Sequence, residues 1–203
     1  MPYRSAHHAL ICCFVDHARP GHSGWQDLHD PKSRDDIKLD LRGELETAAM
    51  QSTFRSGLSG TDEICGEAAM VWKHLVRMGD TRASTLIIKT CPPRMPSKLD
   101  PQATLPHWAF ETALRWLVDE SAQVVTGLSH YRARRDAIRM CLGGKLKSSM
   151  TADKCDVSTR TVDRLVGRVK SWIGPIEAQA WAEMQDRLES AGLIEREMVG
   201  CTG

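Results

Sequence analysis

From Thr61 onward, apolar side chains recur every three or four positions, the spacing that places them on one face of an α-helix. The first such segment begins after Thr61, a good N-cap residue, and ends at Gly79. A second segment runs from Pro106, which suits a first helical turn, to Gly127. The pattern therefore predicts a mainly α domain over residues 61–203.

The helical spacing continues toward the C-terminus. One helix is predicted to start near Ser129 and to end at the pair Gly143-Gly144. Another is predicted over Ser158–Trp172, and a last helix opens with Pro175 in its first turn and runs to Gly192. Three separate helices are therefore expected in this part of the chain, with a short partner helix before Ser158.

Other segments lack this pattern. Residues 1–60 are predicted to form a polar, mobile or extended N-terminal arm, with at most a short helix around Leu39–Phe54. Five prolines between Cys91 and Pro106 exclude a long regular element there and indicate a proline-rich loop or linker. Only Thr85–Ile88 has the character of a short strand, and no alternating strand pairs joined by hairpin turns are visible.

Charge is distributed unevenly along the chain. The whole sequence has 27 Lys plus Arg and 26 Asp plus Glu, a net charge of +1. The segment His130–Lys170 alone holds eleven basic and four acidic residues, a balance of +7, so the remainder carries −6. This asymmetry favours a polyanionic partner that is confined to one part of the molecule.

Composition excludes several classes of protein. No stretch reaches the eighteen or so apolar residues of a membrane span, and Ala9–Val15 is too short and badly flanked for a signal peptide. Seven scattered cysteines favour reduced thiols over a disulfide framework. We therefore expect a cytoplasmic protein that has no membrane contact and no cofactor.

The basic segment contains the pattern of a helix-turn-helix at about residues 145–172. Small or apolar side chains stand where two crossing helices and their turn need them: Ala152, Cys155, Val157, Val162 and Leu165. The hydroxyl of Ser158 is placed to cap the second helix by accepting the backbone amide of Thr161. The segment Ser158–Trp172 is therefore predicted to be a recognition helix.

The outer face of that helix supplies the groups that read base edges in a major groove. They are Thr159, Arg160, Asp163 and Arg164. Basic and hydroxyl side chains around them are candidates for phosphate contacts, which set affinity and register but do not read sequence. These candidates are Lys145, Lys147, Ser148, Ser149, Thr151, Lys154 and Arg168. Double-stranded DNA is the expected partner.

Two positions depart from the usual motif, and alternatives stay open. Asp156 stands where a Gly is usual in the turn, and Thr151 stands where a larger apolar residue is common. A packed three-helix bundle with a solvated basic face explains the same pattern without DNA. For Asp163, an ion pair on the helix surface with Arg160 or Arg164 is favoured over a base contact.

Residues 134–173, with their basic helix, Gly break, Ala152 and the run Val157–Val162, resemble the helix-turn-helix of bacterial sigma-factor region 4 and of phage Q-type antitermination proteins. The Trp-bearing helices on either side of the proline-rich crossing are similar in layout to the Q-type proteins. This resemblance implies a phage or mobile-element protein that binds DNA near a promoter and lets RNA polymerase read through terminators. No segment resembles sigma region 2, so a complete sigma factor is not expected.

An N-terminal group of histidines and cysteines invites a zinc interpretation, because imidazole and thiolate are zinc ligands. Its strongest members are His8, Cys12 and His17, and His8 and Cys12 would share one helix face. No Cys-x-x-Cys pair accompanies them. We therefore expect no metal site and a polar arm instead.

The competing functional class is a DNA-processing accessory protein or a recombinase or nuclease. Its candidate nucleophiles are Tyr131, which lies beside Arg132, and Cys91, which lacks an evident partner base. No Gly-rich phosphate loop follows a strand. A non-enzymatic regulator of transcription is therefore preferred.

The acidic last helix carries an apolar face of Ile176, Ala180, Met184 and Leu188, with Trp181 one position round. Closure of the helix-turn-helix core by this face is the favoured interpretation. The alternative is contact with another protein, either RNA polymerase or a second copy in a homodimer.

Overall fold

The computed structural model describes residues 3–17, 62–96, 104–126 and 130–194 of the 203-residue chain. Helices dominate these ranges, which confirms the predicted mainly α class. In chain order the elements are α1 (Ala6–His17), α3 (Asp62–Val76), α4 (Asp80–Thr90), β1 (Arg94–Pro96), β2 (Thr104–Pro106), α5 (Trp108–Val124), α6 (Tyr131–Cys141), α7 (Ser148–Cys155) and α8 (Thr159–Ser190). None of the described helices combines the length and the apolar character that a bilayer crossing requires.

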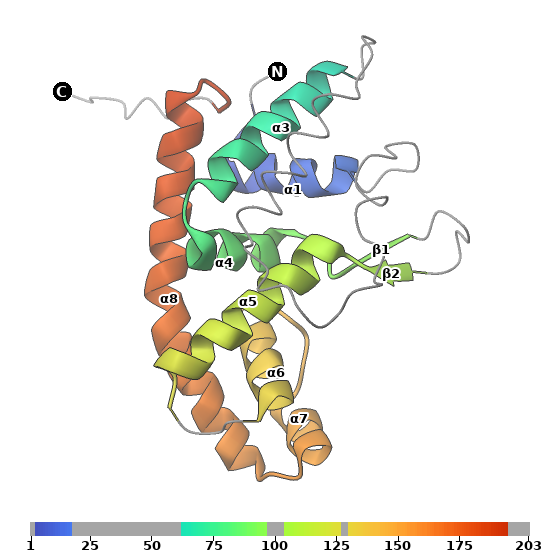
Figure 1. Cartoon of the computed structure of the whole chain (residues 1–203), viewed down its shortest axis with the longest axis vertical. Coiled ribbons are helices and arrows are strands. Elements are labelled where there is room, and N and C mark those ends of the chain that lie inside the picture. The colour runs from blue at the N-terminus through green and yellow to red at the C-terminus, as the bar shows by residue number, and fades with distance from the viewer. Residues whose placement is uncertain (1–2, 18–61, 97–103, 127–129, 195–203) are drawn as a thin grey trace, which may run out of the picture.

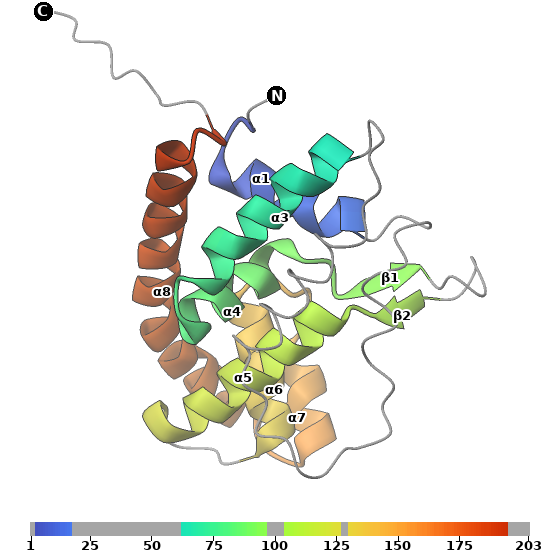
Figure 2. The same ribbon diagram turned by 45° about the horizontal axis from the view of Figure 1, so that its top comes forward.

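The long helix α8 runs along one side of the molecule and joins two groups of helices (Figure 1). Its C-terminal half contacts α1, α3 and α4, which we call the upper group, and its N-terminal half contacts α6 and α7. Helix α5 lies between α4 and α6 and completes the lower group of α5, α6 and α7, as Figure 2 also shows. One continuous apolar core extends through both groups.

Helix α8 replaces the two helices that were expected on either side of Gly174. Pro175 was predicted to open a new helix, and the structure instead places it inside a helix of 32 residues. A proline removes one backbone hydrogen bond and usually breaks a helix. Burial outweighs this cost, because Ile173 lies in the core just before the proline and Ala180 lies in it just after. The apolar stripe of α8 therefore continues across Pro175 without a break.

Residues 3–17 differ from the polar arm that was expected for residues 1–60. They form α1, whose apolar face is fully buried in the core: Ala6, Ala9, Leu10, Cys13 and Phe14. The Tyr3 amide donates a hydrogen bond of 2.7 Å to the Leu193 carbonyl, so the start of the chain is joined to the end of α8. The rest of the expected arm, including the suggested helix 39–54, lies outside the described residues.

The short strand expected at Thr85–Ile88 is wrong, because these residues lie in α4. Helix α4 packs between α5 and α8, and residues 83–88 are all buried. Burial on every side removes the alternation between apolar and polar positions that reveals a helix. The Thr85 hydroxyl donates to the Thr81 carbonyl at 2.7 Å, which satisfies this polar group inside the core.

The proline-rich crossing contains a small strand pair that the sequence did not reveal. Strands β1 and β2 pair antiparallel, with Arg94 opposite Pro106. The Arg94 guanidinium also donates to the Thr104 hydroxyl at 2.8 Å and to the Thr104 carbonyl at 2.7 Å. Pro106 therefore lies in β2, and α5 begins two residues later, at Trp108.

Aromatic rings close the contact between α1, α3 and α5. The Phe14 ring meets Trp72 edge-on at 5.1 Å, and Trp72 stacks on Trp108 at 6.2 Å between ring centroids. His107, which precedes α5, lies 6.0 Å from Phe14 and is only 4% exposed. Burial lowers the pKa of His107 from 6.5 to about 4, so its ring is neutral at pH 7.

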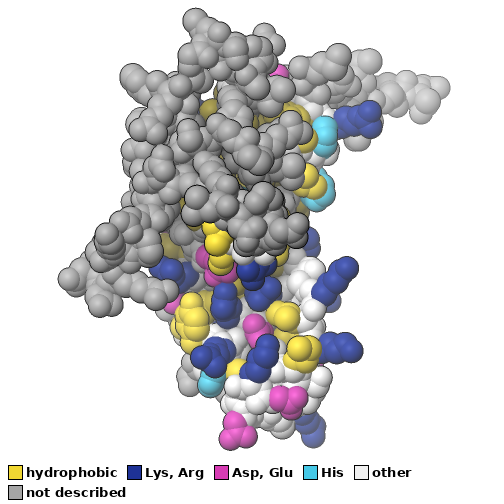
Figure 3. Space-filling model, turned by 90° about the vertical axis from the view of Figure 1, so that its right-hand side faces the viewer, with side chains coloured by type: hydrophobic (Ala, Val, Ile, Leu, Met, Phe, Trp, Pro, Cys, Tyr) yellow, Lys and Arg dark blue, Asp and Glu magenta, His cyan; other side chains and the backbone are white. Residues whose placement is uncertain are grey.

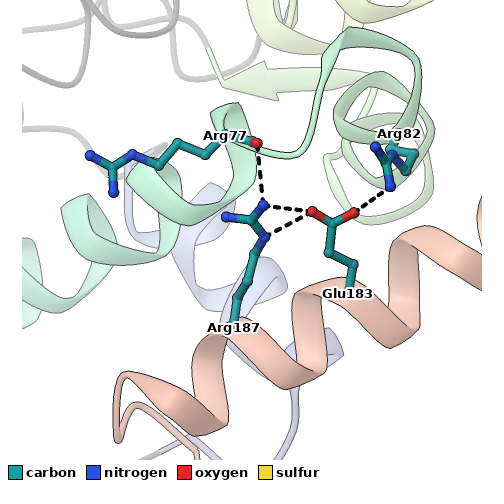
Figure 4. A network of polar contacts seen from close by, with 4 residues as sticks. All are labelled: Arg77, Arg82, Glu183 and Arg187. Carbon is teal, nitrogen blue, oxygen red and sulfur yellow. Dashed lines mark hydrogen bonds and ion pairs between the residues drawn. The ribbon is translucent and has the colours of Figure 1, made fainter.

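Charged side chains hold the C-terminal part of α8, residues 177–190, against the upper group. We call this part the network end of α8. Glu183 accepts from Arg82 of α4 and from Arg187, each at 2.6 Å, and Arg187 also donates to the backbone carbonyl of Arg77 (Figure 4). Glu177 pairs with Lys89 of α4 at 2.9 Å. The upper group therefore covers most of the apolar face of this helix segment, so this face is buried within the same chain.

Candidate nucleic-acid interface

Helices α7 and α8 are joined by a turn of three residues, and α6 packs against both. Asp156 adopts the left-handed conformation, with φ 52° and ψ 49°, at the place where a glycine is usual. The Val157 amide donates back to the Ala152 carbonyl at 3.1 Å, which closes the end of α7. Asp tolerates this conformation better than most residues, so the turn forms without glycine.

The side chains predicted to pack the inside of this motif are where the sequence placed them. Ala152, Cys155, Val162 and Leu165 are buried, and Val157 packs against the core from the turn. The Thr161 amide donates to the Ser158 hydroxyl at 3.2 Å, so the predicted N-cap of α8 is confirmed. These contacts fix the rotation of α8 about its own axis.

That rotation decides which side chains of α8 face outward. The four predicted base-reading residues, Thr159, Arg160, Asp163 and Arg164, are all exposed. We call residues 159–169 the turn end of α8. Among the described residues, Arg160 and Arg164 form no ion pair and no side-chain hydrogen bond, and the ion pair expected for Asp163 is also not formed. Two guanidiniums about 6 Å apart along the helix are therefore available to a ligand.

The predicted phosphate-binding residues fall into two sets. Lys145, Lys147, Ser149 and Lys154 are exposed around the turn end, and Ser148 is half-buried, with its hydroxyl 3.9 Å from the Met140 sulfur. Lys and Arg side chains are scattered over the lower half of the face drawn in Figure 3, with hydrophobic and acidic side chains between them.

Thr151 and Arg168 belong to the second set, because each is already bound within the protein. Thr151 is 1% exposed, and its hydroxyl donates to an Asp136 carboxylate oxygen at 3.0 Å. The expected phosphate contact of Thr151 is therefore wrong. Arg168 is exposed, but its guanidinium donates to the Thr126 carbonyl at 2.6 Å and so joins α8 to the end of α5.

Part of the basic segment serves the fold. Arg134 is buried, and its guanidinium donates to the Ser121 carbonyl of α5 at 2.6 Å. Arg135 forms an ion pair with Glu111 of α5 at 2.8 Å. Arg134 precedes the buried Ala137 by three positions, and this spacing was a signal in the sequence that Arg134 faces the core.

Asp136 is a second residue whose role the sequence did not reveal. It lies on α6, and the hydrogen bond that it accepts from Thr151 joins α6 directly to α7. Asp136 therefore helps to orient α7 against α6.

The residues behind the zinc interpretation are only partly brought together. The Cys12 sulfur lies 3.4 Å from Nε2 of His8, as expected for two residues on one helix face. The side chain of His17 lies outside the described residues. Within the described ranges, no group of three His, Cys, Asp or Glu side chains is arranged to hold a metal ion.

The enzyme candidates lie in contrasting surroundings. Cys91 is buried, its thiol donates to the Pro92 carbonyl at 3.5 Å, and burial raises its pKa far above the ordinary value. The thiol therefore stays protonated at neutral pH and is a poor nucleophile. Tyr131 is 49% exposed at the start of α6, beside the exposed Arg132.

Comparisons with protein-family models, with curated proteins and with solved structures find no match for this chain. The side chains of the turn end and their surroundings are therefore the basis for assigning a function.

Proposed function

We propose that the protein is a sequence-specific, double-stranded-DNA-binding regulator of transcription and that the turn end of α8 reads base edges in the major groove. The observation that carries the proposal is the exposure of Arg160 and Arg164 without partners in the described residues, on a helix whose inner face is fixed by Val162 and Leu165. Arg pairs through two hydrogen bonds with the O6 and N7 acceptors of guanine.

The surrounding cations support the same ligand. Lys145 and Lys147 precede α7, and Lys154 lies in its last turn, so exposed ammonium groups lie before and along the first helix of the motif. Phosphates on both sides of a groove require such flanking cations, which give affinity and orientation without sequence preference. Antitermination through RNA polymerase is our more specific proposal, and it rests on the resemblance of residues 134–173 to Q-type proteins.

The test begins with the selection of bound duplexes from a random library, followed by affinity measurements on the selected and a random duplex at one salt concentration. We expect Arg160→Ala or Arg164→Ala to weaken binding to the selected duplex by about 1 to 3 kcal/mol. Lys147→Ala should weaken both duplexes alike and lower the salt slope by about 1. Equal losses on both duplexes for both arginines would exclude base reading.

Arg168→Ala is a matched control, because Arg168 lies four residues beyond Arg164 but is bound to the Thr126 carbonyl. Its removal should weaken folding more than it weakens discrimination between the two duplexes. An in vitro assay of terminator read-through, with the selected site beside a promoter, then tests the antitermination proposal. Repression or activation without read-through would indicate an ordinary regulator.

A further inference from the structure

A second group of cations lies beside the other end of α8, on α3 and at the residue that directly follows this helix. Met70, Lys73 and Arg77 follow one another at helical spacing and are all exposed, and Met70 is 45% exposed. Lys73 and Arg77 form no ion pair among the described residues. We call Met70, Lys73 and Arg77, together with the adjoining Arg187, the α3 cationic face.

Glu183, the carboxylate that pairs with Arg187 of this face, is already engaged. Glu183 pairs with both Arg82 and Arg187, so one carboxylate is shared by two guanidiniums. Figure 4 shows the Arg77 guanidinium directed away from Glu183, while its backbone carbonyl accepts from Arg187. The contacts within the described residues therefore leave Lys73 and Arg77 without an ion pair.

His74 lies in the last turn of α3, next to Lys73. Its pKa is lowered by burial and then by the charges of Arg187, Arg77 and Lys73. Like charges that gather around a half-buried group are unfavourable without an anion, and this favours an anionic ligand that lies outside the described residues.

The length of α8 separates the α3 cationic face from the turn end. Arg160 and Arg187 lie on one continuous helix and are separated by about 40 Å along its axis. A major groove is only about 8.5 Å deep and curves around the duplex. If the turn end enters that groove, the network end lies well outside the same duplex, so its anionic partner is a different molecule.

We propose that the α3 cationic face is a docking surface for an acidic segment of another protein. Exposed cations beside an apolar Met70 suit a peptide that carries several carboxylates and an apolar side chain. The existence of the surface rests on its own residues. Only the exclusion of DNA as its occupant rests on the proposed function.

The test uses an oligo-glutamate peptide and the full chain, with NMR titration of His74 and fluorescence anisotropy as readouts. Bound carboxylates should raise the pKa of His74 toward its ordinary value, because they oppose the charges of Lys73 and Arg77. The double substitution Lys73→Gln with Arg77→Gln should lower peptide affinity roughly five- to ten-fold, by the loss of two exposed charge contacts. The single substitutions serve if the double variant does not fold.

A variant of matched charge, Lys145→Gln with Lys147→Gln, separates the two surfaces. It should weaken DNA binding and leave the effect of the peptide on His74 unchanged, whereas the Lys73 and Arg77 variant should keep its DNA affinity. Unchanged peptide affinity in the latter variant, or no response of His74, would overturn the proposal. It would also be overturned if duplex DNA changed the pKa of His74 and the Lys73 and Arg77 variant bound duplex DNA more weakly. If the protein bound the peptide beside His74 but did not bind DNA, the docking surface would stand and the proposed function would be refuted.

Discussion

At the network end of α8, Glu177 and Glu183 pair with Lys89 and Arg82 of α4, whereas the charged side chains of the turn end have no such partners within the described residues. Both ends use the same residue types on one helix. Opposite charges from neighbouring helices meet at the first end, and an excess of cations remains exposed at the second. Paired charges fix the position of α8, and unpaired charges remain available for a ligand.

The largest expected effect comes from a change of pH, which acts at the buried His107 between α1 and α5 and not at the turn end of α8. The unfolded chain protonates His107 near pH 6.5, whereas the folded protein resists protonation until about pH 4. Stability is therefore full above pH 6.5 and declines as the pH falls toward 4, by about 3 kcal/mol in total and about 2 kcal/mol by pH 5. Hydrogen exchange should reveal the loss around α1 and α5 first.

His107→Gln removes this titration and provides the control. Its free energy of unfolding, measured with urea at neutral pH and at about pH 5, should change less than that of the unaltered protein. The lowered pKa of His74 contributes in the same direction, so a smaller decline remains in the variant. Equal declines in both proteins would show that protonation of His107 is not coupled to folding.

Two carboxylates on α8 test the contrast between its ends directly. Glu183→Gln removes the charge that is shared by Arg82 and Arg187, and we expect a loss of about 1 to 2 kcal/mol in the free energy of unfolding. Asp163→Asn makes the same chemical change where no ion pair is formed, and it should leave stability within about 0.5 kcal/mol. Urea denaturation of both variants measures the difference.

The DNA affinity of these two variants should change in the opposite order. Asp163→Asn removes a negative charge beside Arg160 and Arg164, so binding to a random duplex should strengthen, while Glu183→Gln should leave it unchanged. A strong loss of stability in Asp163→Asn, or of DNA affinity in Glu183→Gln, would contradict the division of roles along α8.

Local chemistry explains what could be predicted from the sequence. The Ser158 cap and the glycine stop at the end of α6 depend on residues within one or two turns. The inner face of α8 at its turn end follows from helical spacing alone. These features were predicted correctly because their partners are close in the chain.

Distant contacts explain the rest. Pro175 lies inside α8 because two different groups of helices bury the residues on either side of it. Arg134 and Thr151 are used internally because their partners, Ser121 and Asp136, come from other helices. Whether a basic or hydroxyl side chain meets solvent or another helix depends on packing between elements, which sequence spacing alone does not contain.

The last contrast concerns the turn before α8, which is held by backbone geometry and not by paired charges. Asp156 has a φ of 52°, a value that costs most residues about 1 to 2 kcal/mol and costs glycine little. Asp156→Gly should therefore raise the free energy of unfolding by at most about 1 kcal/mol, since glycine also gains entropy in the unfolded chain. Asp156→Val should lower it by about 1 to 2 kcal/mol. Both are measured by urea denaturation, and a neutral Asp156→Val would mean that the turn relaxes to another conformation. In that case, the orientation of α7 against the turn end would also change, and DNA affinity should fall together with it.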